Sequence, residues 1–287
     1  MNINPLKKTI DNNILPLAWL SLILFFSPAV FAAPDSNALV FWSASNEENA
    51  QTINHDAWQL LLNRYLNSNH PSGIHRFNYA AVTTEDQKAL DLYLKEMQQL
   101  NPRRFSRAEQ KAYWINLYNA LTVELILKSY PVKSITKLGD SFLSFGPWDD
   151  NVANIERHDL SLNDIEHRIL RPLFRDNRIH YAVNCASLSC PNLAATAYTA
   201  TNTHRQLEEA ARQYINHPRG VTFEGVRPEE TTLKISSIYH WYLEDFGNSD
   251  QALISHLTNY AEPPLAEQLR QYDGDIESHY NWALNEP

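Results

Sequence analysis

The two cysteines of the chain lie close together, at Cys185 and Cys190, with Ser187 and Ser189 between them. Nearby cysteines in an exported protein commonly pair, because the compartment is oxidising. A disulfide that closes so short a loop stabilises a fold by only about 2 kcal/mol. The spacing therefore favours a local disulfide whose main effect is to shape this loop.

The same loop also has the residue types of a nucleophilic site. Pro191 suits the first turn of a helix, which would place Cys190 at a helix N-terminus, where the pKa of a thiol falls. His180 is the nearest candidate base, and Glu166 or Asp245 would orient its imidazole. This alternative predicts a thiol-dependent hydrolase or acyl transferase that acts on an amide or ester, with either cysteine as the nucleophile.

Other chemistry fits the sequence less well. A zinc site would need Cys185, Cys190, His180 and His167, whose spacing matches no familiar ligand pattern. Dithiol redox centres usually have two residues between their cysteines, and this pair has four. The chain also has no glycine-rich phosphate loop and no Gly-x-Ser-x-Gly turn. We therefore predict no metal and no cofactor.

Three predicted elements position these residues. Residues 179–184 have the pattern of a buried strand, which would place His180 and Asn184 on one face. Residues 164–170 are expected to form a helix that carries Glu166. A long helix over 108–129 is apolar on nearly every side, and it presents Asn116 and Asn119 on one face. Buried amides need partners, so each either ties down a neighbouring loop or lines a pocket.

The remaining pattern is mostly helical. Apolar spacing predicts helices near residues 55–65, 84–101, 207–215, 238–246 and 251–260. Thr84 with Gln87, and Ser106 with Glu109, have the spacing of capping boxes at the starts of two helices. A short strand is expected within 77–82, and a hairpin within 221–235. The predicted fold class is α+β and helix-rich.

The N-terminus has the features of a cleavable signal peptide. Lys7 and Lys8 precede an uncharged apolar run over residues 14–26, and Val30-Phe31-Ala32 offers small residues for cleavage. We expect residues 1–32 to be removed, 33–52 to form a polar lead-in, and 53–287 to form one globular domain. The protein is therefore predicted to be periplasmic or secreted.

Charge and hydropathy limit the partners. The chain carries 24 Lys and Arg against 33 Asp and Glu, a formal net charge of −9. This acidity, without a basic block, argues against nucleic acid as a partner. No second apolar run has the length of a membrane span. An unknown small molecule or peptide is the expected partner.

Several blocks together resemble the domain-of-unknown-function 547 family. They follow in the family's order, with Asn281 where the family usually has Asp, and they are residues 112–122, 162–171, 180–191, 241–247 and 280–285. The resemblance covers roughly residues 58–285 and implies a distant relation to papain- and transglutaminase-type folds, but it supplies no activity.

Polar and aromatic residues in or beside these blocks are candidates for ligand binding. The candidates are Trp114, Asn116, Asn119, Asn184, Arg171, Trp241 and Asp245. Together the sequence predicts an exported soluble domain with a disulfide-shaped loop that borders a ligand-binding cleft. The alternative is the thiol-dependent hydrolase or acyl transferase described above.

Overall fold

The structure, a computed structural model, describes residues 36–139, 145–225 and 231–287. The predicted signal peptide over residues 1–32 lies outside the described residues, as does part of the aromatic segment that follows Phe142. Contacts group Ala32–Pro287 into one compact unit.

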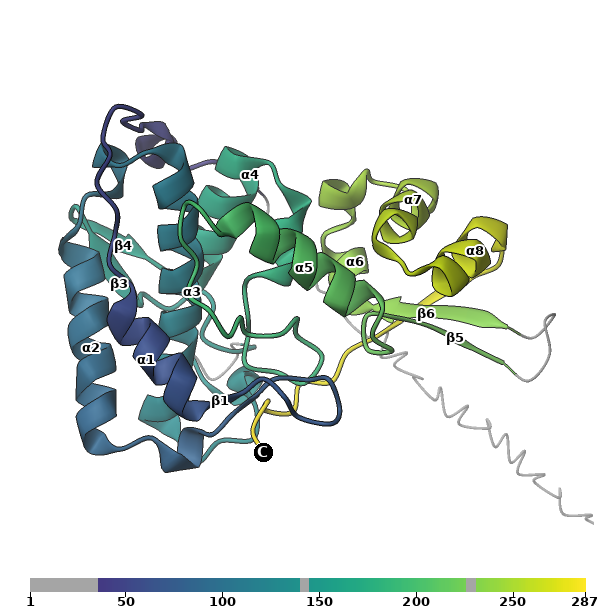
Figure 1. Cartoon of the computed structure of the whole chain (residues 1–287), viewed down its shortest axis with the longest axis horizontal. Coiled ribbons are helices and arrows are strands. Elements are labelled where there is room, and N and C mark those ends of the chain that lie inside the picture. The colour runs from purple at the N-terminus through teal and green to yellow at the C-terminus, as the bar shows by residue number, and fades with distance from the viewer. Residues whose placement is uncertain (1–35, 140–144, 226–230) are drawn as a thin grey trace, which may run out of the picture. The chain divides into compact units, whose positions relative to one another are not determined.

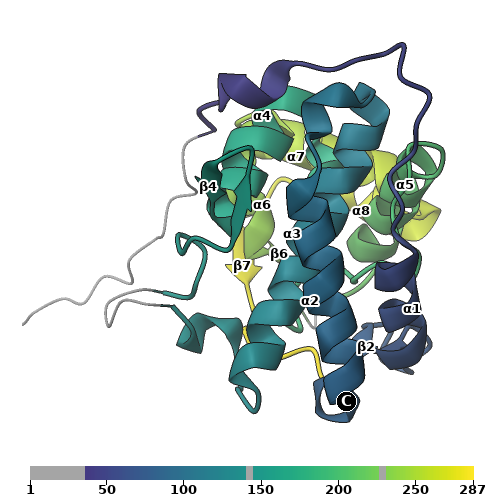
Figure 2. The same cartoon turned by 90° about the vertical axis from the view of Figure 1, so that its left-hand side faces the viewer.

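Three helices form the first half of this unit. They are α1 (Asp56–Tyr65), α2 (Thr84–Gln99) and α3 (Arg107–Ser129), and Figure 2 shows α2 and α3 side by side. Ser106 caps α3 as predicted, by accepting a hydrogen bond from the backbone N–H of Glu109. The cap of α2 is Thr83, one residue before the predicted Thr84, and it accepts from the N–H of Asp86.

The third helix lies at the centre of the larger core. Leu117 and Leu121 are fully buried, which explains why its sequence is apolar on nearly every side. The polar lead-in also contributes to this core. Within the 3-10 turn Val40–Ser43, Trp42 is buried and its ring centroid lies 5.2 Å from that of Trp114.

Short strands lie between α1 and α2 and again after α3. The strands β1 (Leu66–Asn67) and β2 (Arg76–Phe77) form one antiparallel pair, and β3 (Ala153–Ile155) and β4 (His158–Leu160) form another. The helix predicted over 164–170 is present as a π-helix, Asp164–Leu170, and continues into α4 (Arg171–Phe174).

Residues 179–184 do not form the predicted strand. Asp176 caps a 3-10 turn, Asn177–Tyr181, by accepting a hydrogen bond from the N–H of Arg178. The carbonyl of Ile179 then accepts from Ala182 and Val183, so the local backbone groups are satisfied within the turn and not by a neighbouring strand. The short apolar run fits a buried turn as well as a buried strand, because periodicity alone does not separate the two.

A small sheet and four helices form the second half. Figure 1 shows α5 (Thr203–Ile215) in green, with the other helices towards the C-terminus in yellow-green. The sheet order is β5 (Val221–Glu224), β6 (Thr232–Ser236) and β7 (Ile276–His279), antiparallel and then parallel. The remaining helices are α6 (Ser237–Trp241), α7 (Asp250–Tyr260) and α8 (Pro263–Gln271).

The architecture confirms a helix-rich α+β fold. Two hydrophobic clusters hold it together, one around α3 and one between the sheet and helices α5–α8. Tyr181 belongs to the second cluster, whereas Ala182, Ala186 and Leu193 belong to the first. The cysteine segment therefore lies where the two clusters meet.

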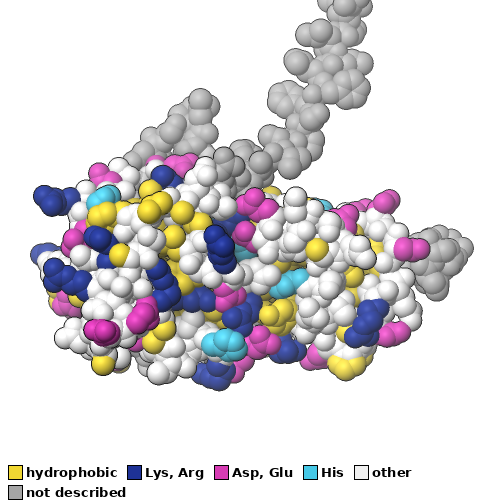
Figure 3. Space-filling view, turned by 90° about the horizontal axis from the view of Figure 1, so that it is seen from above, with side chains coloured by type: hydrophobic (Ala, Val, Ile, Leu, Met, Phe, Trp, Pro, Cys, Tyr) yellow, Lys and Arg dark blue, Asp and Glu magenta, His cyan; other side chains and the backbone are white. Residues whose placement is uncertain are grey.

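Two further observations concern the surface and the membrane. On the face seen in Figure 3, acidic and basic side chains are interspersed. Within the three described ranges, every helix is too short or too polar to cross a membrane.

Candidate functional site

The cysteine loop is positioned by an amide of the central helix. The Asn119 side chain donates to the carbonyl of Ala182 at 2.9 Å and accepts from the N–H of Asn184 at 2.8 Å. Asn184 in turn donates to the carbonyl of Pro191 at 2.7 Å and accepts from the N–H of Ala186 at 2.9 Å. Two buried amides therefore fix both ends of the loop on α3.

Asn116 and Trp114 have structural surroundings. The amide of Asn116 donates to the carbonyl of Tyr198 at 2.8 Å and accepts from its N–H at 2.9 Å. Trp114 is buried against Trp42. With Asn119, these residues of α3 tie down loops inside the core, so the structure gives none of them an open edge towards a ligand.

In this structure both cysteines are free thiols, so the predicted disulfide is not formed in it. The backbone N–H of Cys185 donates to Sγ of Cys190 at 2.9 Å, and that sulfur also lies 3.7 Å from the carbonyl oxygen of Val183. The sulfur of Cys185 lies instead beside two hydroxyls, 3.1 Å from Tyr280 and 3.2 Å from Ser187. The two cysteines therefore contact each other without a disulfide, and Cys185 also has two hydroxyl neighbours.

The helix predicted after Pro191 is also absent. Residues 191–198 lack helical structure, and the next helix, α5, begins at Thr203. Asn192 is held by long-range contacts, because its Oδ1 accepts from the backbone N–H of His75 at 2.9 Å. Cys190 therefore has no helix N-terminus to lower the pKa of its thiol.

Local hydrogen bonds distinguish the two thiols. Burial raises the pKa of Cys185, but hydrogen bonds with Cys190, Ser187 and Tyr280 outweigh burial and lower the pKa overall. Burial and the neighbouring Cys185 raise the pKa of Cys190 well above its ordinary value. Cys185 is also the more exposed of the two. Exposure and hydrogen bonding both favour Cys185 as the more reactive thiol of the pair.

The hydroxyl of Tyr280 is the donor to this sulfur. Ser187 donates its single proton to the Tyr280 oxygen at 3.0 Å, which leaves the phenol proton for Sγ of Cys185. Burial of the hydroxyl raises the pKa of Tyr280 well above its ordinary value, so it stays protonated. Sequence reasoning missed both hydroxyls, although each lies in a block of the predicted family resemblance.

A partly exposed group of aromatic rings flanks Tyr280. Its ring centroid lies 4.5 Å from that of Trp282 and 4.8 Å from that of Trp241. Trp282 also contacts Trp148 and Phe145, each at 5.4 Å. We call these residues the aromatic rim, and its members are Phe145, Trp148, Trp241, Tyr280 and Trp282. The predicted binding residue Trp241 is thus near Cys185.

His180 does not contact either cysteine within the described residues. Its Nε2 lies 2.7 Å from Oδ2 of Asp245, and its Nδ1 faces Oε1 of Glu166 at 3.7 Å. Its ring stacks on Tyr242 with centroids 4.3 Å apart. Because both ring nitrogens face carboxylates, His180 is not placed to take a proton from a thiol. The predicted Cys–His pair is therefore not assembled in this structure.

The surrounding charges favour a protonated His180. Burial lowers its pKa, but the hydrogen bond with Asp245 and the charges of both carboxylates raise it overall. Burial raises the pKa of Asp245, but the hydrogen bonds from His180 and Arg171 outweigh it and lower the pKa to about 2. Burial also raises the pKa of Glu166, but His167 and His180 outweigh burial and lower this pKa to about 2. We call His180, Glu166, Asp245 and Arg171 the charge cluster.

Arg171 joins the charge cluster to the protein surface. Its guanidinium is buried, donates to Asp245 at 2.6 Å and pairs with Glu244. Arg171 and Asp245 also border a hollow of about 760 Å³, whose other lining residues are Ser36, Pro172, Phe174, Arg175, Asp176, Asn177 and Arg178. Neither cysteine lines this hollow, so it is not the cleft predicted beside the cysteine loop.

Among the described residues, no group of three or more His, Cys, Asp or Glu side chains is arranged to hold a metal ion. The two thiols and the two histidines considered for zinc have other neighbours. Nδ1 of His167 accepts a hydrogen bond from Arg171 at 3.3 Å, and burial lowers the pKa of His167 to about 4.

The comparison with protein families gives one result. Residues 102–215 match the family described as "Protein of unknown function, DUF547". The match extends from the turn before α3, through Glu166, Arg171 and His180 of the charge cluster and the cysteine loop, to the last residue of α5. It confirms the predicted resemblance over this segment. No curated protein and no solved structure matches the chain.

Proposed function

We propose that the protein is an exported, thiol-dependent hydrolase or acyl transferase that acts on esters, with Cys185 as its nucleophile. One observation carries this proposal. Cys185 is a free, partly exposed thiol, and its sulfur accepts a hydrogen bond from the Tyr280 hydroxyl at 3.1 Å. Its hydrogen bonds lower the pKa of this thiol. Export rests on the signal-peptide pattern that ends at Ala32.

The proposed step is acyl transfer to sulfur. The Cys185 thiolate attacks the carbonyl carbon of an ester, an S–C bond forms, and the C–O bond to the leaving alkoxide breaks. The alkoxide takes a proton from water, and hydrolysis of the thioester then releases the acid and restores the thiol. An ester suits this site better than an amide, because an amine leaves slowly without a placed acid.

The aromatic rim supports an apolar acyl group. Trp241 and Trp282 lie on either side of Tyr280, whose hydroxyl contacts the sulfur. Partly exposed aromatic rings provide a large contact area at little cost in conformational entropy. The charge cluster is proposed to position this rim, since the His180–Asp245 bond anchors the turn that follows Trp241.

Alkylation tests the nucleophile. We expect iodoacetamide at mildly acidic pH to label wild-type protein on Cys185, and the Cys190→Ser variant at a similar rate. The matched Cys185→Ser variant is expected to lose the labelling. Labelling of Cys190 alone, or a disulfide found in a non-reduced digest, would contradict the proposal.

A binding protein without catalysis is the second candidate. The hollow bordered by Arg171 and Asp245 favours it, because that site is large enough for a small molecule and is lined by charged side chains. This candidate predicts ligand-dependent protection of the hollow with no turnover. Protection of the hollow by a bound ligand, together with no ester hydrolysis above that of the Cys185→Ser variant, would support it against the thiol mechanism.

A further inference from the structure

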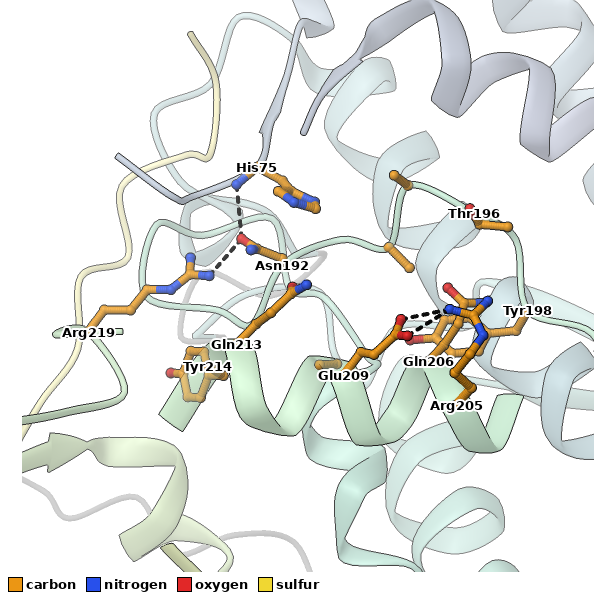
Figure 4. A pocket seen from close by; sticks show the side chains of 13 residues that line it. His75, Asn192, Thr196, Tyr198, Arg205, Gln206, Glu209, Gln213, Tyr214 and Arg219 are labelled. Carbon is orange, nitrogen blue, oxygen red and sulfur yellow. Dashed lines mark hydrogen bonds and ion pairs between the residues drawn. The ribbon is translucent and has the colours of Figure 1, made fainter. Parts of the chain in front are cut away.

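A second cavity, separate from the hollow beside Asp245, lies behind the cysteine loop. It has a volume of about 170 Å³ and lies between α5 and the segment that follows Pro191. Figure 4 shows Arg219 reaching towards Asn192 at one side, with Gln213 beside it and the Arg205–Glu209 pair at the other. Its apolar surface comes from Ala194, Ala195, Ala210 and the ring of Tyr214.

Arg219 is a buried cation that lacks an acidic partner among the described residues. It is only 8% exposed, and its two terminal nitrogens donate to neutral oxygens, the Leu188 carbonyl at 3.1 Å and Oδ1 of Asn192 at 2.6 Å. Its Nε is buried without any hydrogen-bond partner. The guanidinium lies over the ring of Tyr214, 5.3 Å from the ring centroid. Buried charges are normally paired with an opposite charge, so this guanidinium beside a cavity calls for an anion.

The other charges of the cavity leave this cation uncompensated. Arg205 is neutralised by Glu209 at 2.8 Å. Burial lowers the pKa of His75, and its Nδ1 donates to the carbonyl of Leu193 at 2.7 Å, so the ring is neutral at physiological pH. The lining therefore carries one net positive charge, that of Arg219.

The lining of this cavity also has side chains whose hydrogen-bonding groups are unused. The side chains of Gln213 and Thr196 line the cavity and form no hydrogen bond within the three described ranges. The Gln213 amide lies beside Arg219, whereas Thr196 lies on the other side of the cavity (Figure 4). An amide beside an arginine is suited to a carboxylate with a short polar or apolar substituent. The volume fits a molecule no larger than an amino acid.

We propose that this cavity is a binding site for a small monocarboxylate, with Arg219 as the residue that binds its carboxylate. One negative charge matches the single unpaired cation, whereas a dianion such as phosphate would leave a charge unbalanced. The ligand would lie next to the cysteine loop, because the same guanidinium holds the Leu188 carbonyl. The proposal is independent of the ester chemistry at Cys185.

Calorimetric titration with propionate, L-alanine and inorganic phosphate tests the proposal, with propionamide as the uncharged control. We expect saturable binding of propionate or L-alanine, and no binding of propionamide. Saturable binding of phosphate with no binding of either carboxylate would overturn the assignment of ligand class.

Variants then locate the site. Gln213→Glu places a carboxylate in the cavity lining without breaking any hydrogen bond. Because this carboxylate repels a bound carboxylate and can pair with Arg219, we expect it to weaken carboxylate binding by about tenfold or more. Arg219→Gln is expected to abolish binding. The matched control is Arg212→Gln, which removes an exposed arginine of α5 that pairs with Glu208 outside the cavity. Unchanged affinity in the folded Gln213→Glu protein, or equal loss in the control, would contradict the site.

Discussion

At the scale of single residues, the proposal depends on a few hydrogen bonds to one sulfur atom. Either cysteine could be the nucleophile from the sequence, but the structure distinguishes them. Sγ of Cys185 lies within hydrogen-bonding distance of the Tyr280 and Ser187 hydroxyls, whereas Sγ of Cys190 accepts from the backbone N–H of Cys185. The pKa of Cys185 is lowered, whereas the pKa of Cys190 is raised well above its ordinary value. Reactivity is therefore expected to be specific to one cysteine.

Tyr280→Phe removes the hydroxyl that donates to Sγ of Cys185. A hydrogen bond to a charged group is worth about 1.5–3 kcal/mol, so we expect the thiol pKa to rise and alkylation of Cys185 at pH 6.5 to slow by about tenfold or more. Tyr130→Phe is the control, since the hydroxyl of Tyr130 donates to Glu286 at 2.8 Å, away from the cysteines. Equal rates for both variants would show that Tyr280 does not stabilise the thiolate.

Asp245→Asn tests the charge cluster. It leaves Arg171 and His180 without the carboxylate that both contact, so we expect a loss of about 3 kcal/mol in the free energy of unfolding. The control Glu244→Gln removes a carboxylate that is 55% exposed, so its loss is expected to be below about 1 kcal/mol. Urea denaturation measures both, and similar midpoints would contradict a structural role for Asp245.

The same cluster predicts the response to acid. The pKa of Asp245 is lowered to about 2, so its stabilising effect is fully present above its ordinary pKa and is lost as the pH falls towards 2. We therefore expect the difference in stability between wild type and Asp245→Asn to shrink between pH 5 and pH 2. The urea midpoint measured at each pH gives the result, and a difference that stays constant would contradict the lowered pKa.

At the scale of elements, α3 is the helix that organises the site. Asn119 holds the cysteine loop, whereas Asn116 holds the segment around Tyr198. Asn119→Leu and Asn116→Leu should each leave two buried backbone groups without a hydrogen-bond partner. We expect each to lower the free energy of unfolding by about 2–4 kcal/mol. Only Asn119→Leu is expected to change the alkylation rate of Cys185. A similar change in both variants would mean that loop position and reactivity are unrelated.

The sequence predicts elements best where local signals are strong. The Ser106 cap and apolar pattern predict α3 closely, and the β5–β6 hairpin lies where alternation indicates it. The sequence predicts the cysteine loop poorly, because long-range hydrogen-bond partners decide the conformation of this loop. Asn119 and Ser187 are far apart in sequence from Ala182 and Tyr280, and no local pattern reports such pairings. His180 is identified as important, but its carboxylate partners give it a different role from the predicted base.

At the scale of the whole molecule, the proposal includes export. An exported protein meets an oxidising compartment, in which the two cysteines must stay unpaired for the proposed chemistry. We expect the mature protein to begin at Ala33, after cleavage at the pattern that ends with Ala32. N-terminal sequencing of protein secreted or released from the periplasm checks this prediction. A mature chain that begins at Met1 would contradict it.

The junction of the two hydrophobic clusters explains how an isolated thiol can stay free after export. The loop is fixed by Asn184 on one side, and on the other Tyr214 donates to the carbonyl of Ser189 at 2.6 Å. Closing a disulfide would break the 2.9 Å contact between the Cys185 N–H and Sγ of Cys190. The buried surroundings of Cys190 and the raised pKa of its thiol also slow exchange.

The most direct test of the central claim is the mass of the protein after brief reaction with 4-nitrophenyl acetate and an acid quench. We predict one added acetyl group, located on the peptide that contains Cys185, and its absence from the Cys185→Ser variant but not from Cys190→Ser. An acetyl group on another residue, or no adduct on wild-type protein with both thiols free, would contradict Cys185 as the nucleophile.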